Sequence, residues 1–169
     1  MFAAFETANL LLQPFQRTDA PALFRFMNDA RAMQHTYIAA TLEQCSNRLS
    51  VYEDMRATLG FSPWVARVSE DTEPIGWGGL SVDPEEPEWG LEISHAFSPS
   101  TWGNGYATEL VQASLAYAFG PLGVQEIHAF AKQENAASVR VLEKCGFNLL
   151  QYEPRLKRSR YRAAVPSAA

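Results

Sequence analysis

Two closely spaced glycines separate an extended segment from a helical one in the stretch best suited to hold a ligand. The extended run ends near Phe97 and the helical run begins near Tyr106, with Gly103 and Gly105 between them. Such a turn points free backbone N–H groups at whatever lies over the helix start, and the helix dipole adds positive character. The turn therefore suits a phosphate or pyrophosphate. It is not a P-loop, because no lysine followed by serine or threonine comes after it.

A second motif lies farther along, after a short β-like segment. It reads Asn135-Ala-Ala-Ser-Val-Arg-Val-Leu-Glu-Lys-Cys-Gly-Phe147. Together the two motifs resemble the GNAT superfamily of acyl-CoA-dependent N-acetyltransferases. Residues 102–107, Trp-Gly-Asn-Gly-Tyr-Ala, match its pyrophosphate motif Q/R-x-x-G-x-G/A, with Trp102 in the Q/R position. The Thr-Glu that follows is typical of the branch that includes ribosomal-protein N-terminal acetyltransferases.

The resemblance implies that acetyl-CoA is the acyl donor and suggests where it binds. The N–H groups of residues 103–107 should cradle the pyrophosphate, and a splay between the central strand and the next parallel strand should admit the pantetheine arm. The Asn135 side chain should contact the pantetheine amides, although the same residue could instead cap its helix. The expected cofactor-binding residues are Ala96, Phe97, Ser98, Trp102, Gly103, Asn104, Gly105, Tyr106, Ala107 and Asn135.

Ser138 is the candidate proton donor to the departing thiolate, because it occupies the serine position that this branch uses near the sulfur. Many GNAT enzymes use a tyrosine in the second motif instead, and the corresponding slot here is Leu142. The resemblance therefore leaves Ser138 or water as the donor.

Glu92 is the candidate general base, because it stands in the place of the glutamate on the family's central strand. A carboxylate there could take the amine proton directly or through water. His95 is a second candidate, since Ser94-His95 replaces the Gly-Tyr pair common in the branch. Strict alternation would place Glu92 and Ser94 on one face of the strand, with Ile93 and His95 on the other.

Composition limits the partners. The 169 residues are 47% hydrophobic with a formal charge of −5, as expected of one soluble domain spanning 1–169. Five of the 14 basic residues follow Glu153, whereas all 19 acidic residues precede residue 154, so the body of the chain should attract amines and repel nucleic acid. Two isolated cysteines provide neither a disulfide framework nor a metal site. No signal-like or membrane-spanning run is present, which favours a cytoplasmic protein.

The remaining elements predict a mixed α/β fold, GNAT-like, with a mostly antiparallel sheet of six to seven strands and helices on both faces. Expected strands cover about residues 10–15, 62–69, 74–82, 89–97, 124–131, 147–153 and 159–164. Expected helices begin after a cap at Thr18 or Asp19, at Thr41, near Tyr106 and at Asn135. The helix from Thr41 should end at Gly60, and its expected apolar stripe is Leu42, Cys45, Leu49, Tyr52, Met55 and Leu59. The glycines at 76–79 favour a bulge or a close backbone approach over a ligand loop.

The leading hypothesis is direct acetyl transfer from acetyl-CoA to a primary amine, without an acyl-enzyme. The acceptor would be a peptide or protein N-terminus or a small-molecule amine. The alternative is a non-catalytic acyl-CoA-binding or regulatory module, which the missing tyrosine permits. An edge strand near the C-terminus could support a homodimer.

Overall fold

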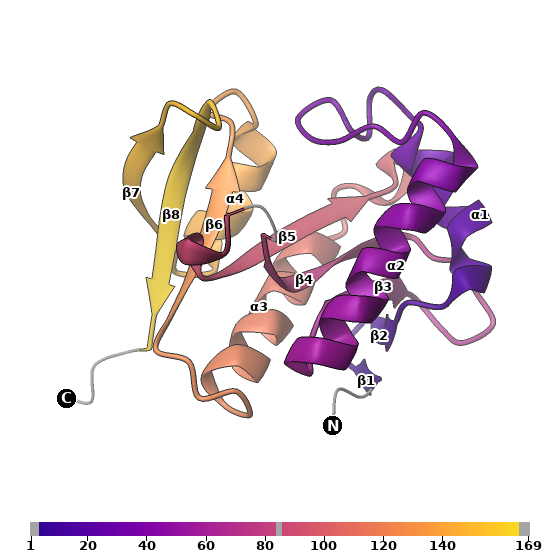
Figure 1. The fold of residues 1–169 in the computed structure, drawn as a ribbon, viewed down its shortest axis with the longest axis horizontal. Coiled ribbons are helices and arrows are strands. Elements are labelled where there is room, and N and C mark those ends of the chain that lie inside the picture. The colour runs from indigo at the N-terminus through magenta and orange to yellow at the C-terminus, as the bar shows by residue number, and fades with distance from the viewer. Residues whose placement is uncertain (1–3, 84–85, 166–169) are drawn as a thin grey trace.

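The computed structural model describes residues 4–83 and 86–165. Figure 1 shows its helices and strands. In chain order they are β1 (Phe5–Glu6), β2 (Leu11–Pro14), η1 (Arg17–Asp19), α1 (Ala20–Met27), α2 (Leu42–Leu59), β3 (Pro63–Arg67), β4 (Gly76–Val82), η2 (Pro87–Trp89), β5 (Leu91–Phe97), η3 (Pro99–Thr101), α3 (Tyr106–Phe119), β6 (Glu126–Ala131), α4 (Ala136–Lys144), β7 (Asn148–Glu153) and β8 (Arg158–Ala164).

The strands form one sheet in the order β1-β2-β3-β4-β5-β6-β8-β7. Among the described strands β5 and β6 are the one parallel pair, and α3 provides the crossover between them. The neighbours on either side, β4 and β8, pair antiparallel with them. The predicted mixed, mostly antiparallel sheet is therefore confirmed. It has one strand more than expected, because the two-residue β1 adds an edge.

Each face of the sheet has its own hydrophobic core, because side chains alternate along the strands. On β3, Trp64 packs with the residues of α3, whereas its neighbour Val65 packs with those of α1 and α2. On β5, Ile93 belongs to the α3 side and Ala96 to the α2 side. In Figure 1, α1 and α2 accordingly lie over one face, and α3 and α4 over the other.

The glycines of β4 allow close packing and are not part of a ligand loop. A Cβ on Gly78 would lie 2.5 Å from the Ser94 carbonyl oxygen of the adjacent strand. Gly79 has a φ of +125°, and a Cβ there would lie 2.5 Å from the ring of fully buried Trp64. Close backbone approach, the favoured prediction for this segment, is what the packing requires.

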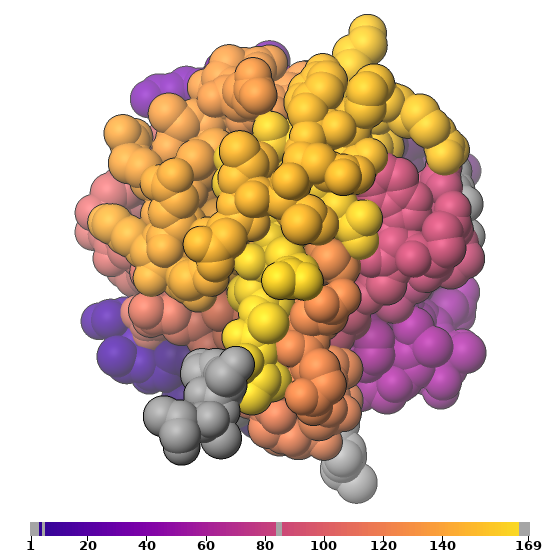
Figure 2. Space-filling view, turned by 90° about the vertical axis from the view of Figure 1, so that its left-hand side faces the viewer, coloured from indigo at the N-terminus to yellow at the C-terminus, as the bar shows by residue number. Residues whose placement is uncertain are grey.

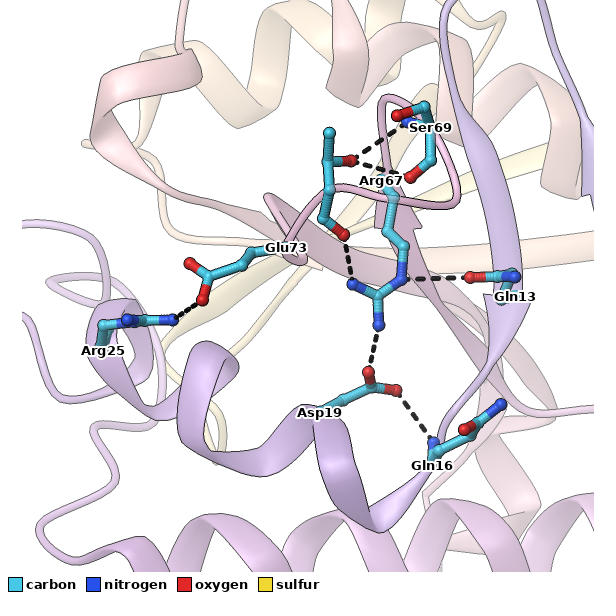
Figure 3. Close-up of polar contacts among 8 residues, drawn as sticks. Gln13, Gln16, Asp19, Arg25, Arg67, Ser69 and Glu73 are labelled. Atoms are coloured by element: carbon cyan, nitrogen blue, oxygen red, sulfur yellow. Dashed lines mark hydrogen bonds and ion pairs between the residues drawn. The ribbon is translucent and has the colours of Figure 1, made fainter.

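Asp19 occupies the N-cap position of α1, one of the two caps expected, but its side chain makes no capping hydrogen bond to that helix. It joins a polar cluster under the helix instead (Figure 3). One carboxylate oxygen pairs with Arg67 and the other accepts the Gln16 N–H at 3.0 Å. Arg67 also donates to Gln13 at 3.1 Å and to the Thr72 carbonyl at 2.7 Å. Because both charged groups are largely buried, these bonds replace the lost hydration and fix η1 against the β2–β3 pair.

Helix α2 begins and ends where the sequence predicts. The Thr41 hydroxyl accepts the Gln44 N–H at 3.1 Å, and Gly60 closes the helix at a φ of 80°. Its apolar stripe is narrower than expected, because Leu42 and Leu59 are exposed. No helix of the described residues has both the length and the apolarity to cross a membrane.

The outer edge of the sheet is β7 and not the last strand, because β8 lies between β6 and β7. Figure 2 shows this side of the molecule, formed largely by α4, β7 and β8. Strand β7 exposes Leu149, Leu150 and Tyr152. A homodimer through an edge strand stays a prediction, and its edge would be β7.

The basic C-terminal segment is engaged in part with acidic side chains. Arg155 pairs with Glu86, and an Arg162 nitrogen lies 3.5 Å from a Glu126 carboxylate oxygen. These pairs reduce the free positive charge that a nucleic acid would need at this surface.

Candidate functional site

Strands β5 and β6 pair in parallel over a short stretch and then separate. Their paired positions are Glu92 with His128 and Ile93 with Ala129. Beyond them β5 keeps β4 on one edge, while its other edge borders a cleft of about 710 Å³. In Figure 1 the sheet opens at this point, between β5 and the β6-β8-β7 group. The predicted splay is therefore present, and the cleft lies beside it.

The cleft brings together most of the residues expected to hold the cofactor. Its lining includes Ala96, Phe97, Trp102, Gly103, Gly105, Tyr106, Ala107, Asn135 and Ser138. Ser98, Asn104 and Glu92 are outside that lining. The Ser98 N–H donates to the Ile75 carbonyl at 2.8 Å, and the Asn104 side chain donates to the Thr101 carbonyl at 2.8 Å. These bonds hold the loop, and the cofactor contacts expected of Ser98 and Asn104 stay a prediction.

The glycine loop presents open backbone donors at one end of the cleft. Gly103 and Gly105 have φ values of 85° and 81°, and a Cβ on either would meet nothing within 4 Å. Glu109 is the first residue of α3 whose N–H bonds a backbone carbonyl, that of Gly105 at 3.0 Å. Residues 103–108 of the described chain therefore keep free N–H groups at the positive end of a helix. This arrangement fits a pyrophosphate.

Trp102 anchors the loop to the end of β5. Its indole N–H donates to the Phe97 carbonyl at 2.8 Å, while much of its ring stays exposed. This bond occupies the carbonyl of a residue whose main chain was expected to meet the pantetheine arm. The free edge available to that arm therefore lies mainly at His95, because Ser94 and Ala96 direct their main-chain groups to β4. An extended ligand could add there as a strand does.

Glu109 holds the start of α3 against the β1–β2 turn. Its carboxylate accepts from the Asn9 N–H at 2.6 Å and from the Asn9 side chain at 3.0 Å. Partial desolvation opposes ionisation, yet the hydrogen bonds from Thr7 and Asn9 outweigh it and lower the pKa of Glu109. The charge near the helix N-terminus stabilises the helix that carries the loop.

Asn135 and Ser138 lie at the start of α4. The Asn135 side-chain oxygen accepts the Ser138 N–H at 3.2 Å, so the capping role is observed. The Asn135 amide nitrogen donates to no recorded acceptor in the described structure, which leaves it able to meet a ligand. Ser138 is half-buried and lines the cleft. Leu142, in the slot where many family members have a tyrosine, is buried in the core.

Glu92 faces the α2 side of the sheet. It is half-buried, and the Ser81 hydroxyl donates to it at 3.4 Å. Desolvation and the charge of Asp83 raise the pKa of Glu92 to about 7, against the opposing effects of Ser81, Arg158 and Arg48. A carboxyl group with such a pKa can exchange a proton near neutral pH.

His95 points to the opposite face from Glu92, as alternation predicts, and it lines the cleft. Desolvation lowers the pKa of His95 to about 4, so the imidazole is neutral at physiological pH. One acceptor amine cannot readily reach both groups, because the strand separates them.

Several lining residues escaped the sequence analysis. The α1–α2 connection contributes Gln34, His35 and Thr36, and Arg158 of β8 holds it by donating to the His35 carbonyl at 3.1 Å. The sequence carries no signal for that contact. Four cations also line the cleft, namely Lys132, Arg140, Lys144 and Arg158. The spacing of Arg140 and Lys144, one helical turn apart on α4, was the available signal for two of them.

A smaller hollow of about 330 Å³ lies between α1 and η3. It is bordered by the exposed Arg25–Glu73 ion pair and lacks the glycine loop's free N–H groups. The larger cleft is therefore the candidate site.

The fold and cleft define an acyltransferase architecture, a splayed mixed sheet with an anion-binding loop at the mouth of the splay. The family profile described as Acetyltransferase (GNAT) domain matches residues 9–148, and the chain belongs to that family. GNAT acetyltransferases use acetyl-CoA, and the open glycine loop fits it.

Individual relatives of this chain are also named as acetyltransferases. The chain is 30% identical over 173 residues to the uncharacterized N-acetyltransferase YoaA of Bacillus subtilis, covering 98% of this chain and 93% of that protein. An acetyltransferase structure from Agrobacterium tumefaciens has a TM-score of 0.84 at 22% identity, covering 98% and 96% of the two chains. RimL, a ribosomal L7/L12 acetyltransferase solved with coenzyme A, has a TM-score of 0.77 at 15% identity, covering 94% and 96%. The family favours an enzyme over the non-catalytic binding module.

Proposed function

We propose that this acetyltransferase moves an acetyl group directly from acetyl-CoA to a primary amine, either a protein N-terminus or a small amine. The observation that carries the proposal is the cleft between β5 and β6, with the Gly103–Gly105 loop at its end. When bound, acetyl-CoA supplies the thioester that reacts with the amine. Neither cysteine lines the cleft, which agrees with transfer that forms no acyl-enzyme.

The proposed roles divide between the two ends of the cleft. The free N–H groups of residues 103–107 bind the pyrophosphate, and the edge of β5 that borders the cleft at His95, beside Ala96 and Phe97, receives the pantetheine arm. The Asn135 amide nitrogen donates to that arm while its oxygen caps α4. Holding both reactants in place supplies much of the rate enhancement, about 7–11 kcal/mol in favourable systems.

Proton transfer is assigned to Glu92 and Ser138. The Glu92 carboxylate accepts the proton that the attacking amine loses, directly or through one water. The Ser138 hydroxyl is the donor of the proton taken up by the departing sulfur. Glu92 then gives its proton to solvent, and the serine alkoxide takes one back from solvent, so that both groups are restored. The Glu92 pKa of about 7 supports its role, because a base works best when its pKa lies near the working pH.

The first experiment measures acetyl-CoA binding by calorimetry and then free CoA release with a panel of amines. The panel holds amino acids, polyamines, aminoglycosides and short peptides with free N-termini. Micromolar binding with release on one class identifies the acceptor. Binding of acetyl-CoA without CoA release on any amine would count against direct transfer to these acceptors. No binding at all would refute the proposal that the glycine loop binds the pyrophosphate.

A Ser138→Ala variant separates chemistry from binding. We expect it to lower kcat while leaving acetyl-CoA affinity unchanged, because its hydroxyl does not hold the cofactor in this proposal. Unchanged turnover would remove Ser138 from the proton pathway and leave water as the donor.

A further inference from the structure

A cation from a distant part of the chain lies beside the glycine loop. The guanidinium carbon of Arg31, in the α1–α2 connection, is 5.4 Å from the centre of the Trp102 ring. Trp102 is itself fixed by the bond from its indole N–H to the Phe97 carbonyl. The tryptophan is therefore a rigid platform next to Gly103, and Arg31 lies on it.

The backbone around Arg31 is held in place locally. A single Asp29 carboxylate oxygen accepts the N–H groups of Arg31 and Ala32, each at 2.8 Å. Met33 is almost fully buried under the same turn. The position of the Arg31 main chain is thus set by the turn, and its exposed side chain is free to extend across Trp102.

The N–H groups of the Arg31 guanidinium remain able to bind a ligand. Among the described residues its guanidinium makes no hydrogen bond or ion pair, and it lies over the ring of Trp102. Stacking uses the flat face of a guanidinium and leaves the N–H groups at its edge able to bind an anion.

The sequence motif explains why such a cation matters here. Position 102 is the Q/R position of the pyrophosphate motif, and this chain has an uncharged tryptophan there, whose indole N–H already donates to the Phe97 carbonyl. The cations that line the cleft, Lys132, Arg140, Lys144 and Arg158, come from the β6–α4 connection, α4 and β8. Arg31 is not itself a lining residue, but its neighbour Ala32 and its contact Trp102 both line the cleft, so it brings positive charge to the rim formed by the α1–α2 connection.

We infer that Arg31, stacked on Trp102, is a cofactor-binding residue that pairs with the pyrophosphate of acetyl-CoA. This inference rests on the proposed cofactor site and adds to it a residue outside both sequence motifs. The interaction is a charge pair at an exposed position, so its contribution is modest and sensitive to salt.

The test compares the Arg31→Gln variant with the wild type by calorimetry on CoA and on 3′-dephospho-CoA. Both ligands carry the pyrophosphate, so the variant should lose about fivefold in affinity for each at low salt. The loss should shrink as salt rises. Arg17→Gln is the matched control, because Arg17 is also exposed but neither it nor its ion-pair partner Glu53 lines the cleft, whereas Arg31 contacts the lining residue Trp102. This control should bind both ligands like the wild type.

A double-mutant cycle with Trp102→Leu tests the stacking. Once the platform is removed, adding Arg31→Gln should cost clearly less than it does in the wild type. Additive losses would mean that Arg31 does not act through Trp102.

Three other outcomes would overturn the inference. A loss seen with CoA alone would assign Arg31 to the 3′-phosphate. An equal loss for pantetheine, measured by competition, would show a structural effect, since pantetheine has no phosphate. Unchanged affinity for CoA would show that Arg31 makes no contact. If the wild type itself fails to bind CoA, the proposed function fails first, and the two failures are thereby distinguished.

Discussion

Replacing Glu92 with glutamine should make the protein more stable at alkaline pH while impairing its activity. In the fold the pKa of Glu92 rises from 4.5 to about 7, chiefly because the half-buried carboxyl is desolvated. Each pKa unit corresponds to about 1.4 kcal/mol, so keeping this group ionised costs the native state about 3 kcal/mol. Glutamine has nearly the same shape and avoids that cost.

The pH dependence follows from proton binding. Between pH 4.5 and about 7 the native state binds more protons at Glu92 than the unfolded chain does. The stabilising contribution of the protonated group is thus complete below pH 4.5 and is lost as pH rises through about 7. The free energy of unfolding of Glu92→Gln, measured relative to that of the wild type, should therefore increase by about 2 to 3 kcal/mol as pH rises from 5 to 8.

Urea unfolding of both proteins at several pH values measures this difference. Glu73→Gln serves as the control, because Glu73 is an exposed carboxylate on the β3–β4 connection paired only at the surface. A stability difference for Glu92→Gln that does not change with pH would refute the assignment of a raised pKa.

Activity tests the same residue independently. If Glu92 is the base, kcat/KM of the wild type should rise with pH through about 7, and the variant should lose this rise together with about 10²–10⁴ in rate. Asp83→Asn should move the midpoint of the rise to lower pH, because it removes the like charge that helps raise the pKa of Glu92. If the Glu92→Gln variant is stabilised but fully active, the raised pKa of Glu92 is supported and Glu92 is excluded as the base.

Other expected outcomes concern the loop and the core. Gly105→Val should weaken CoA binding at least tenfold in calorimetry, because a β-branched residue is strained at a φ of 81°; normal binding would show that the loop does not hold the pyrophosphate. Asp19→Asn should lower the free energy of unfolding by about 3 kcal/mol in urea, because it leaves buried Arg67 without a charged partner, and a change below about 0.5 kcal/mol would contradict that reading. Trp64→Ala should cost about 3 to 5 kcal/mol in the same assay, because the fully buried ring packs against Gly79; a near-neutral result would mean that the core relaxes around the gap.

Local pattern determined much of the fold. The Thr41 cap and the Gly60 stop bracket α2 because both signals act through backbone groups within one helical turn. The alternation along β5 placed Ile93 in one core and Glu92 on the other face, since strand geometry fixes that choice residue by residue. Asp19 shows the limit of local reasoning. Its capping pattern was correct for a helix start, but a buried arginine distant in sequence gave its carboxylate a stronger partner.

The sequence by itself determined the class of site, because the glycine loop acts through its backbone N–H groups. The backbone conformation that exposes them depends on two local residues, Gly103 and Gly105. Only the tertiary structure decided which other side chains surround it. Arg31 reaches Trp102, and Arg158 reaches His35, through contacts between segments far apart in the chain. Such contacts leave no periodic or motif-like trace, because they depend on how whole elements pack. The raised pKa of Glu92 has the same origin, since desolvation depends on the surroundings that the completed fold provides.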